Sequence, residues 1–245
     1  MIVDPGKYIS KIWFSNKIDF SVLTVYYQSS VYQKIPGMIS KAFYTKIIDL
    51  QQPESQILAD FEKGTKYEIR RAQVDGIVCS AASDPGKTAL FYNDFAKTKN
   101  LGLLNAANIS SSPHKFFTIA KINENVLVCH LYICDKSKGR VRLLNSGTKI
   151  TDGNSVERAL IGRANRYLHF WDISYFKNLG FTEYDLGGYA YGTSNKSLLG
   201  INSFKDSFGG EFVKEYHYFP LFIWLGLILK QYLSPSVWLH WIKKN

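Results

Sequence analysis

The stretch Tyr184-Asp185-Leu186-Gly187-Gly188 ends an apolar run with two glycines, and sixteen residues later Phe204-Lys205-Asp206-Ser207-Phe208-Gly209-Gly210 ends in two more. Residues 184–186 predict a strand, and glycines directly after a strand let the backbone approach a ligand closely. Lys205 lies between two phenylalanines, and a lysine held in this way stabilises a phosphate or a developing oxyanion. On these residues alone, the alternative stays open that the glycines only form turns and Lys205 is a solvated surface charge.

Outward from this stretch, hydrophobic periodicity predicts alternating strands and helices. Strands are expected at residues 41–50, 77–82, 116–122, 126–134, 140–144 and 212–222. Helices are expected from residues 51–55 to Gly76, at 88–99, at 155–179 and at 197–204. Short polar turns join the three consecutive strands as hairpins. This order predicts an α+β fold with a mixed, mostly antiparallel central sheet and helices on both faces.

The two ends of the chain differ from the middle. Residues 1–37 predict one or two strands and a turn at Ile35-Pro36-Gly37. Residues 223–245 combine aromatic and aliphatic side chains with lysines, which is typical of a terminal helix that packs on the sheet or lies at a membrane surface. We therefore expect an extension at 1–40, one domain at 41–222 and a basic, aromatic tail helix at 223–245.

The composition indicates a globular protein with affinity for polyanions. Apolar residues make up 46% of the 245 residues, enough for a core without disulfides or metal. The net charge of +10 favours nucleic acid, tRNA, anionic lipid or a phosphorylated carrier as partner. The absence of an arginine-rich arm and of zinc-finger spacing disfavours a dedicated DNA-binding protein.

The three cysteines, Cys79, Cys129 and Cys134, predict neither a disulfide nor a metal site. If residues 126–134 form a strand, Cys129 and Cys134 point to opposite faces of it. An odd number of cysteines without a disulfide framework is typical of a reducing compartment. We expect small, buried apolar side chains.

Several common catalytic patterns are missing from the sequence. It has no phosphate-binding loop of the Gly-x-x-x-x-Gly-Lys type, no Gly-x-Ser-x-Gly nucleophile elbow and no His-Glu-x-x-His metal helix. The five histidines are scattered: His114, His130, His169, His217 and His240. These absences weaken hydrolase and metalloenzyme hypotheses, and no metal is expected.

The sequence predicts a cytoplasmic protein, with peripheral contact at the membrane left open. Met1 is not followed by a charged leader and a long apolar segment. The most apolar stretch, residues 219–229, spans eleven residues, whereas a membrane-spanning helix needs roughly 20.

Three motifs in order resemble the Fem-type aminoacyltransferases and their single-domain relatives. The first is Tyr67-Glu68-Ile69-Arg70-Arg71-Ala72, followed by Gly76. The second is Asn165-Arg166-Tyr167-Leu168-His169-Phe170-Trp171, running on to Gly180-Phe181. The third joins Tyr184-Asp185-Leu186-Gly187-Gly188 to Gly200-Ile201 and to Phe204-Lys205 with Phe208-Gly209-Gly210. The similarity extends over residues 43–222.

The resemblance implies a GNAT fold, in which the central strands splay and the acyl donor lies in the gap. It also implies transfer of an acyl or aminoacyl group to an amine without a metal or a tightly bound cofactor. In the Fem group the donor is an aminoacyl-tRNA and the acceptor is a peptidoglycan precursor. The resemblance assigns Lys205 to the transfer site.

Other residues match the motifs with less defined roles. Asp185 is a second catalytic candidate, although it alternatively orients the glycine turn. We expect the following to contact substrate or donor: Arg70, Arg71, Gly187, Gly188, Tyr191, Phe204 and His169. Tyr191, Glu183 and His169 are candidates for relaying a proton.

Two departures from the Fem pattern leave the donor open between aminoacyl-tRNA and acyl-CoA. Only one GNAT-like domain fits, and the pyrophosphate loop of acyl-CoA enzymes is matched poorly by Ile161-Gly162-Arg163-Ala164. Backbone amides near residues 152–155 offer an alternative phosphate site.

The hypothesis from the sequence is an acyl- or aminoacyltransferase that forms an amide on an amino group of a cell-envelope glycan or peptidoglycan precursor, with peripheral contact at the inner membrane surface left open. Two alternatives are an acyl-CoA-dependent N-acyltransferase that acts on a nucleotide-linked amino sugar, and a non-catalytic module that binds polyanions.

Overall fold

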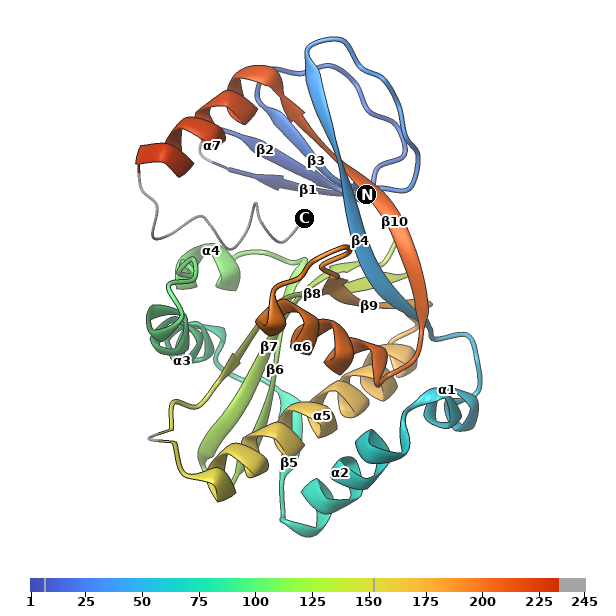
Figure 1. Ribbon diagram of the computed structural model, residues 1–245, viewed down its shortest axis with the longest axis vertical. Coiled ribbons are helices and arrows are strands. Elements are labelled where there is room, and N and C mark those ends of the chain that lie inside the picture. Colours follow the sequence, from blue (N-terminus) through green and yellow to red (C-terminus); the bar gives the residue numbers. More distant parts are fainter. Residues whose placement is uncertain (7, 152, 234–245) are drawn as a thin grey trace. The chain divides into compact units, whose positions relative to one another are not determined.

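The computed structural model describes residues 1–6, 8–151 and 153–233 (Figure 1). They form two compact units, each built from segments that are far apart in the sequence. Unit 1 takes in Met1–Ile47, Gly188–Ser203 and the described part of Glu211–Asn245. Unit 2 takes in Ile48–Gly187 and Phe204–Gly210.

Unit 2 is built on five strands in the order β9-β8-β7-β6-β5. The strands are β5 (Val78–Ala81), β6 (Lys115–Ile122), β7 (Asn125–Asp135), β8 (Arg140–Thr148) and β9 (Glu183–Gly188). Strands β5 to β8 pair antiparallel with their neighbours, while β8 and β9 are parallel. The connection between these parallel strands is the long helix α5 (Ser155–Asn178).

Helices cover both faces of this sheet, as the sequence predicts. Strand β7 shows why, because successive side chains of a strand point to opposite faces. Cys129 and Leu131 pack against helix α3 (Pro85–Thr98), while Val128, which precedes Cys129 and points to the other face, packs against α5. Figure 1 shows α5 lying across β6 and β7, with α2 (Lys63–Val74) beside it.

The helix starts follow local capping rules. The Asp84 side chain accepts a hydrogen bond from Lys87 N at 2.9 Å, and Pro85 occupies the first helical position of α3. The Asn154 side chain accepts one from Val156 N at 2.9 Å at the start of α5. Gly180, with φ +83°, follows the end of α5 as expected for a helix C-terminus.

The predicted helix that ends at Gly76 is wrong in one respect, because it consists of two helices. Helix α1 (Glu54–Asp60) ends where Phe61 turns to an extended conformation, with ψ 143°. The Phe61 ring packs edge-on against Phe208, 5.1 Å between centroids, and Glu62 N donates to the Ser207 carbonyl at 2.9 Å. These contacts with a distant segment break the helix. A further short helix, α4 (Ala106–Ser110), was not predicted.

Unit 1 contains the remaining strands in the order β1-β2-β3-β10-β4. They are β1 (Ile2–Pro5), β2 (Ser10–Trp13), β3 (Thr24–Ser29), β4 (Met38–Asp49) and β10 (Glu211–Pro220). Strands β2 and β3 pair parallel, and the other pairs within this unit are antiparallel. Three strands thus precede β4 where the sequence predicted one or two, because short strands at a sheet edge carry little periodicity.

Helix α6 (Lys196–Asp206) has its first residues in unit 1 and its last residues in unit 2. Helix α7 (Leu221–Leu233) belongs to unit 1 and packs on β10. The predicted tail helix corresponds to α7, while residues 234–245 lie outside the described part of the chain. The limits expected for the extension, domain and tail stay a prediction.

The cysteines lie where the strand pattern puts them. Cys129 packs in the cluster beneath α3, and Cys134 packs in the cluster on the opposite face of the sheet. Burial raises the pKa of the Cys129 thiol to about 12 and that of the Cys134 thiol to about 12. No helix in the described residues is long and apolar enough to span a membrane.

Candidate active site

Lys205 is in the last turn of α6, in unit 2, and its ammonium group lies against the end of β9. A Cβ atom added to Gly187 would lie 3.8 Å from Lys205 Nζ and 2.8 Å from the Leu143 carbonyl oxygen. Gly187 also has φ +78°, a conformation that other residues rarely adopt. The position therefore requires glycine, and the missing side chain brings the lysine close to the backbone.

The place where Lys205 lies is also where β8 and β9 stop pairing. The parallel register joins Arg140–Arg142 to Glu183–Asp185, and within the described residues it extends no further. Leu143 follows directly after Arg142, and Gly187 is the second residue after Asp185. This end of β9 therefore brings a cationic side chain against a backbone position that has no side chain of its own.

Asp185 is completely buried and orients this turn. Its Oδ1 accepts a hydrogen bond from Gly187 N at 2.7 Å, and its Oδ2 accepts one from Arg140 Nη2 at 2.6 Å. Arg142 Nε lies 3.9 Å from the same Oδ2. This geometry supports the alternative in which Asp185 fixes the conformation of the glycine turn.

A second cation, Arg166 of α5, lies near Lys205. Its guanidinium carbon lies 5.1 Å from the centre of the Phe204 ring, a cation–π contact. Phe204 in turn packs on His169, 5.5 Å between centroids, and on Phe208 at 5.2 Å. Arg166 belongs to the second of the three motifs, but no role was predicted for it. The available signal was that Arg166 lies three residues before His169, since helical residues three apart share a face.

His169 also belongs to a buried hydrogen-bond network that was not predicted from the sequence. The His169 Nδ1 lies 2.7 Å from the Tyr184 hydroxyl, which lies 2.6 Å from the Tyr132 hydroxyl. The Tyr132 hydroxyl donates to Asp172 Oδ2 at 2.6 Å. The same oxygen lies 2.8 Å from His130 Nδ1.

The network continues from His130 Nε2 to Asn165 Oδ1 at 2.8 Å. Asn165, His169 and Asp172 recur on one face of α5, and His130 and Tyr132 recur on one face of β7. This spacing of polar residues within apolar faces is the signal that would have predicted the network.

Burial keeps the network uncharged at His169 and at the two tyrosines. The pKa of His169 lies well below its ordinary value because of burial first, and then because of the nearby charges of His130, Lys205 and Arg166. Burial likewise raises the pKa values of Tyr132 and Tyr184 well above their usual range. A neutral His169 leaves the positive charge at this site with Lys205 and Arg166.

Two of the predicted site residues belong to unit 1. Tyr191 is 65% exposed, and its ring lies 4.6 Å from that of Tyr44 and 5.7 Å from that of Phe212. Gly188 lies against Phe43, because an added Cβ would come within 3.2 Å of that ring. These residues form an aromatic surface within unit 1.

The two predicted arginines of α2 do not share the contacts of Lys205. Arg70 and Arg71 are exposed, and Arg71 Nη2 lies 3.8 Å from Asp75 Oδ1 on the same helix. Asp75 Oδ2 accepts a hydrogen bond from Arg163 Nε of α5 at 2.6 Å. Their contact with substrate or donor stays a prediction.

The expected phosphate-binding positions also fall on α5. Gly162 lies inside this helix, so Ile161-Gly162-Arg163-Ala164 does not form a loop. At the start of α5 the Asn154 side chain occupies the N–H of Val156. Residue 152 lies outside the described residues.

Comparison with known proteins gives a likeness in structure only. No protein-family model matches the sequence, and no curated protein sequence is significantly similar to it. The C-terminal domain of a putative lysylphosphatidylglycerol synthetase from Agrobacterium fabrum superposes with TM-score 0.57 and 12% identity, over 87% of this chain and 72% of that one. FemX superposes with TM-score 0.58 and 12% identity, over 77% of this chain and 64% of FemX, just under two thirds of its length.

The chain has a GNAT-like fold. L-PGS from Bacillus licheniformis agrees, with TM-score 0.55 and 12% identity over 87% of this chain and 73% of that one. The resemblance to Fem-type proteins predicted from the sequence is thereby confirmed for the GNAT-like fold.

Proposed function

We propose that this chain transfers an acyl or aminoacyl group to an amino group of a cell-envelope precursor. The observation that carries the proposal is the position of Lys205, whose ammonium group lies against Gly187 where β8 and β9 stop pairing. The fold shared with FemX and with lysylphosphatidylglycerol synthetases supports the same class of reaction. Attack of an amine on the donor carbonyl needs positioning of the two groups and stabilisation of the developing negative charge, and a fixed cation supplies the stabilisation.

The reaction follows from this arrangement in two steps. The acceptor nitrogen attacks the donor carbonyl carbon, a C–N bond forms, and negative charge develops on the carbonyl oxygen. The Lys205 ammonium stabilises that charge. The C–O bond to a tRNA ribose, or the C–S bond to CoA, then breaks, the amine loses a proton and the leaving group gains one.

His169 suits a positioning role better than that of an exposed base. It is 2% exposed, its Nδ1 is bound to the Tyr184 hydroxyl, and it packs on Phe204. Of the other candidates, Glu183 lies at the opposite end of β9 from Gly187, 3.7 Å from Arg140 Nε. Lys205 is therefore the residue that we place at the reacting atoms.

An aminoacyl-tRNA is the donor that the proposal favours. The net charge of +10 suits a polyanionic donor, and the structures with TM-scores above 0.5 include FemX and synthetases of an aminoacylated lipid. Acyl-CoA transfer to a nucleotide-linked amino sugar is the alternative within the same fold. A non-catalytic polyanion-binding module is the alternative outside enzyme function.

A second candidate acceptor is a phospholipid head group. The two lysylphosphatidylglycerol synthetase structures superpose over 87% of this chain, more than the 77% for FemX. An ester to a head-group hydroxyl forms by the same attack on the same carbonyl. Mass spectrometry of the products separates this acceptor from an amino group.

The test replaces Lys205 in a transfer assay with a pool of charged tRNAs and envelope extract. We expect Lys205→Ala to lower kcat by about 100-fold, since losing one oxyanion-stabilising group typically costs that much. Lys205→Arg keeps the charge and is expected to retain part of the activity. Lys196→Ala, at an exposed lysine at the start of α6, is the matched control.

If Lys205→Ala transfers as fast as the wild type in the same assay, Lys205 has no part in the mechanism. Salt-sensitive binding of tRNA by the wild type without any transfer from either class of donor favours the binding module.

A further inference from the structure

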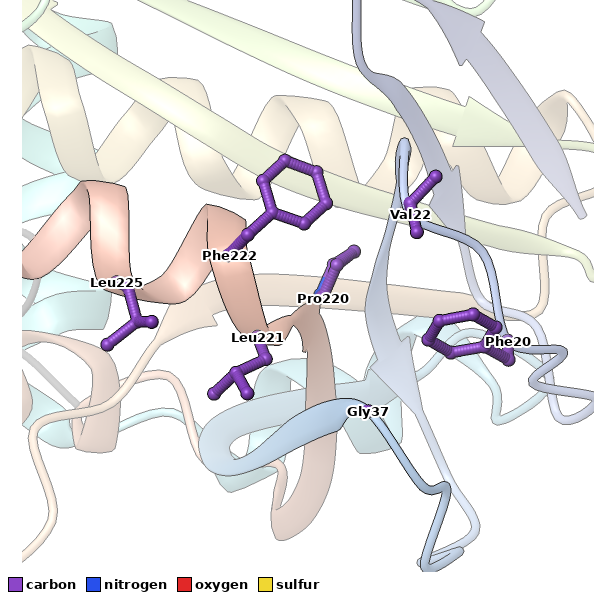
Figure 2. Close-up of a pocket in the computed structure, with 7 residues that line it drawn as sticks. All are labelled: Phe20, Val22, Gly37, Pro220, Leu221, Phe222 and Leu225. Atoms are coloured by element: carbon purple, nitrogen blue, oxygen red, sulfur yellow. The ribbon is translucent and has the colours of Figure 1, made fainter.

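Unit 1 carries an apolar pocket of about 280 Å³ that the proposed reaction does not use. Three segments form it, as Figure 2 shows: the connection between β2 and β3, the turn before β4, and the start of α7. Its lining residues are Phe20, Val22, Gly37, Pro220, Leu221, Phe222 and Leu225. None of these side chains is charged.

The pocket residues are held in place although they are exposed. Leu221 N donates to the Gly37 carbonyl oxygen at 2.9 Å, which joins the start of α7 to the turn. A Cβ atom on Gly37 would lie 2.6 Å from the Phe20 ring, so the ring rests on this glycine. The apolar surface is thus a built feature of unit 1.

Most of the apolar side chains around the pocket are about half-exposed or more. Phe20 is 58% exposed and Phe222 and Leu225 are each 50% exposed. Leu229, one helical turn beyond Leu225, is 60% exposed and continues the stripe along α7. Contiguous exposed apolar side chains of this kind mark an interaction surface.

The charge of unit 1 indicates which kind of partner covers the surface. The described residues of its segments contain eight lysines and no arginine against four acidic residues, a net charge of +4. Lys17, with a side chain 86% exposed, belongs to the same connection as Phe20 and Val22, where it lies 3.8 Å from Asp19. Lys34 is exposed just before the Gly37 turn.

We propose that unit 1 docks on an anionic lipid bilayer, with Phe20, Val22, Phe222, Leu225 and Leu229 inserted at the level of the head groups. Exposed apolar side chains flanked by lysines are the combination that binds such surfaces, because apolar burial and attraction to anionic lipids add up. Lysine suits this role, since its long aliphatic stem lies along the apolar region while the ammonium group stays in water.

The proposal is independent of the transfer reaction, so its test is made without turnover. The full chain is sedimented with vesicles of phosphatidylcholine alone and with vesicles of equal parts phosphatidylcholine and phosphatidylglycerol. We expect binding to the anionic vesicles only, and weaker binding as salt rises. A combined Phe222→Ser and Leu225→Ser variant is expected to bind about tenfold or more weakly.

The matched control is Leu199→Ser, which removes an apolar side chain that is 46% exposed on α6 in the same unit. It is expected to bind as the wild type does. Because the altered side chains lie at the surface, we expect all variants to keep the wild-type Tm. An unchanged Tm shows that a loss of vesicle binding is not caused by unfolding.

Three outcomes overturn the proposal: no binding to anionic vesicles, equal binding by the double variant, or equal loss in the control. Analytical ultracentrifugation adds a fourth. A concentration-dependent dimer that the double variant abolishes assigns the surface to a second copy of this chain.

Discussion

At the scale of single residues, Gly187 decides the geometry of the candidate site. Asp185 fixes its N–H at 2.7 Å, and the Leu143 carbonyl leaves no room for a side chain there. The sequence predicted a close backbone approach from the pair Gly187-Gly188. It did not predict that the approaching groups are Leu143 and Lys205 of the same unit.

Replacing Gly187 by alanine is expected to destabilise the protein and to lower transfer activity. The added Cβ meets the Leu143 carbonyl oxygen at 2.8 Å, and the φ of +78° is strained for alanine. Strain of this kind costs about 1–3 kcal/mol in the free energy of unfolding. Chemical denaturation followed by circular dichroism measures the change.

Gly192→Ala is the control, since Gly192 has φ +71° with no atom within 4 Å of an added Cβ. This variant carries the backbone strain alone. Equal destabilisation of the two variants would contradict the close packing of Gly187.

At the scale of elements, α5 and β7 together build a buried polar layer that neither forms alone. Helical spacing puts Asn165, His169 and Asp172 on one face of α5, and strand alternation puts His130 and Tyr132 on one face of β7. Buried polar side chains are costly unless they are paired, so the two elements fix each other's register. The hydrogen bonds within this layer span 2.6–3.1 Å.

The depressed pKa of His169 predicts that the protein loses stability as pH falls. Burial, His130, Lys205 and Arg166 disfavour its protonation in the folded state, whereas the unfolded chain protonates it near the ordinary value of about 6.5. The unfolded state therefore binds more protons below about pH 6.5, and stability falls by up to about 1.4 kcal/mol per pH unit.

Denaturant titrations between pH 7 and pH 5 measure this slope. His169→Gln is expected to flatten it. A His169→Gln protein that keeps the wild-type slope would show that His169 is not the group responsible.

At the scale of the whole molecule, the charge distribution predicts which donor stabilises the protein. The chain carries 30 basic and 20 acidic side chains, so a charged tRNA is expected to raise the Tm and acetyl-CoA to leave it nearly unchanged. At 100 times its Kd a ligand stabilises by about 2.7 kcal/mol. The effect of tRNA is expected to fall steeply with salt.

Melting followed by tryptophan fluorescence makes this measurement, because the chain has five tryptophans and the RNA is silent. Heparin serves as the control for binding of polyanions in general. Stabilisation by CoA esters and not by charged tRNA would move the proposal to an acyl-CoA-dependent transferase.

Most of the local structure follows from the sequence. The three central strands, α3, α5 and the strand that leads into Gly187-Gly188 were predicted because periodicity, capping residues and glycine act within a few residues of one another. The strand was expected to end before the two glycines, whereas β9 includes both. The fold class followed from the order of these elements and from three motifs.

Tertiary structure alone decided the rest. Phe61 breaks the predicted helix because it packs on Phe208, which is far away in the sequence. The contact of Arg166 with Phe204, the polar layer around His169 and the apolar pocket on unit 1 each join segments that no local pattern connects. A side chain's local preference costs or gains tenths of a kcal/mol, whereas its burial against a distant partner contributes more, and so the distant partner determines these features.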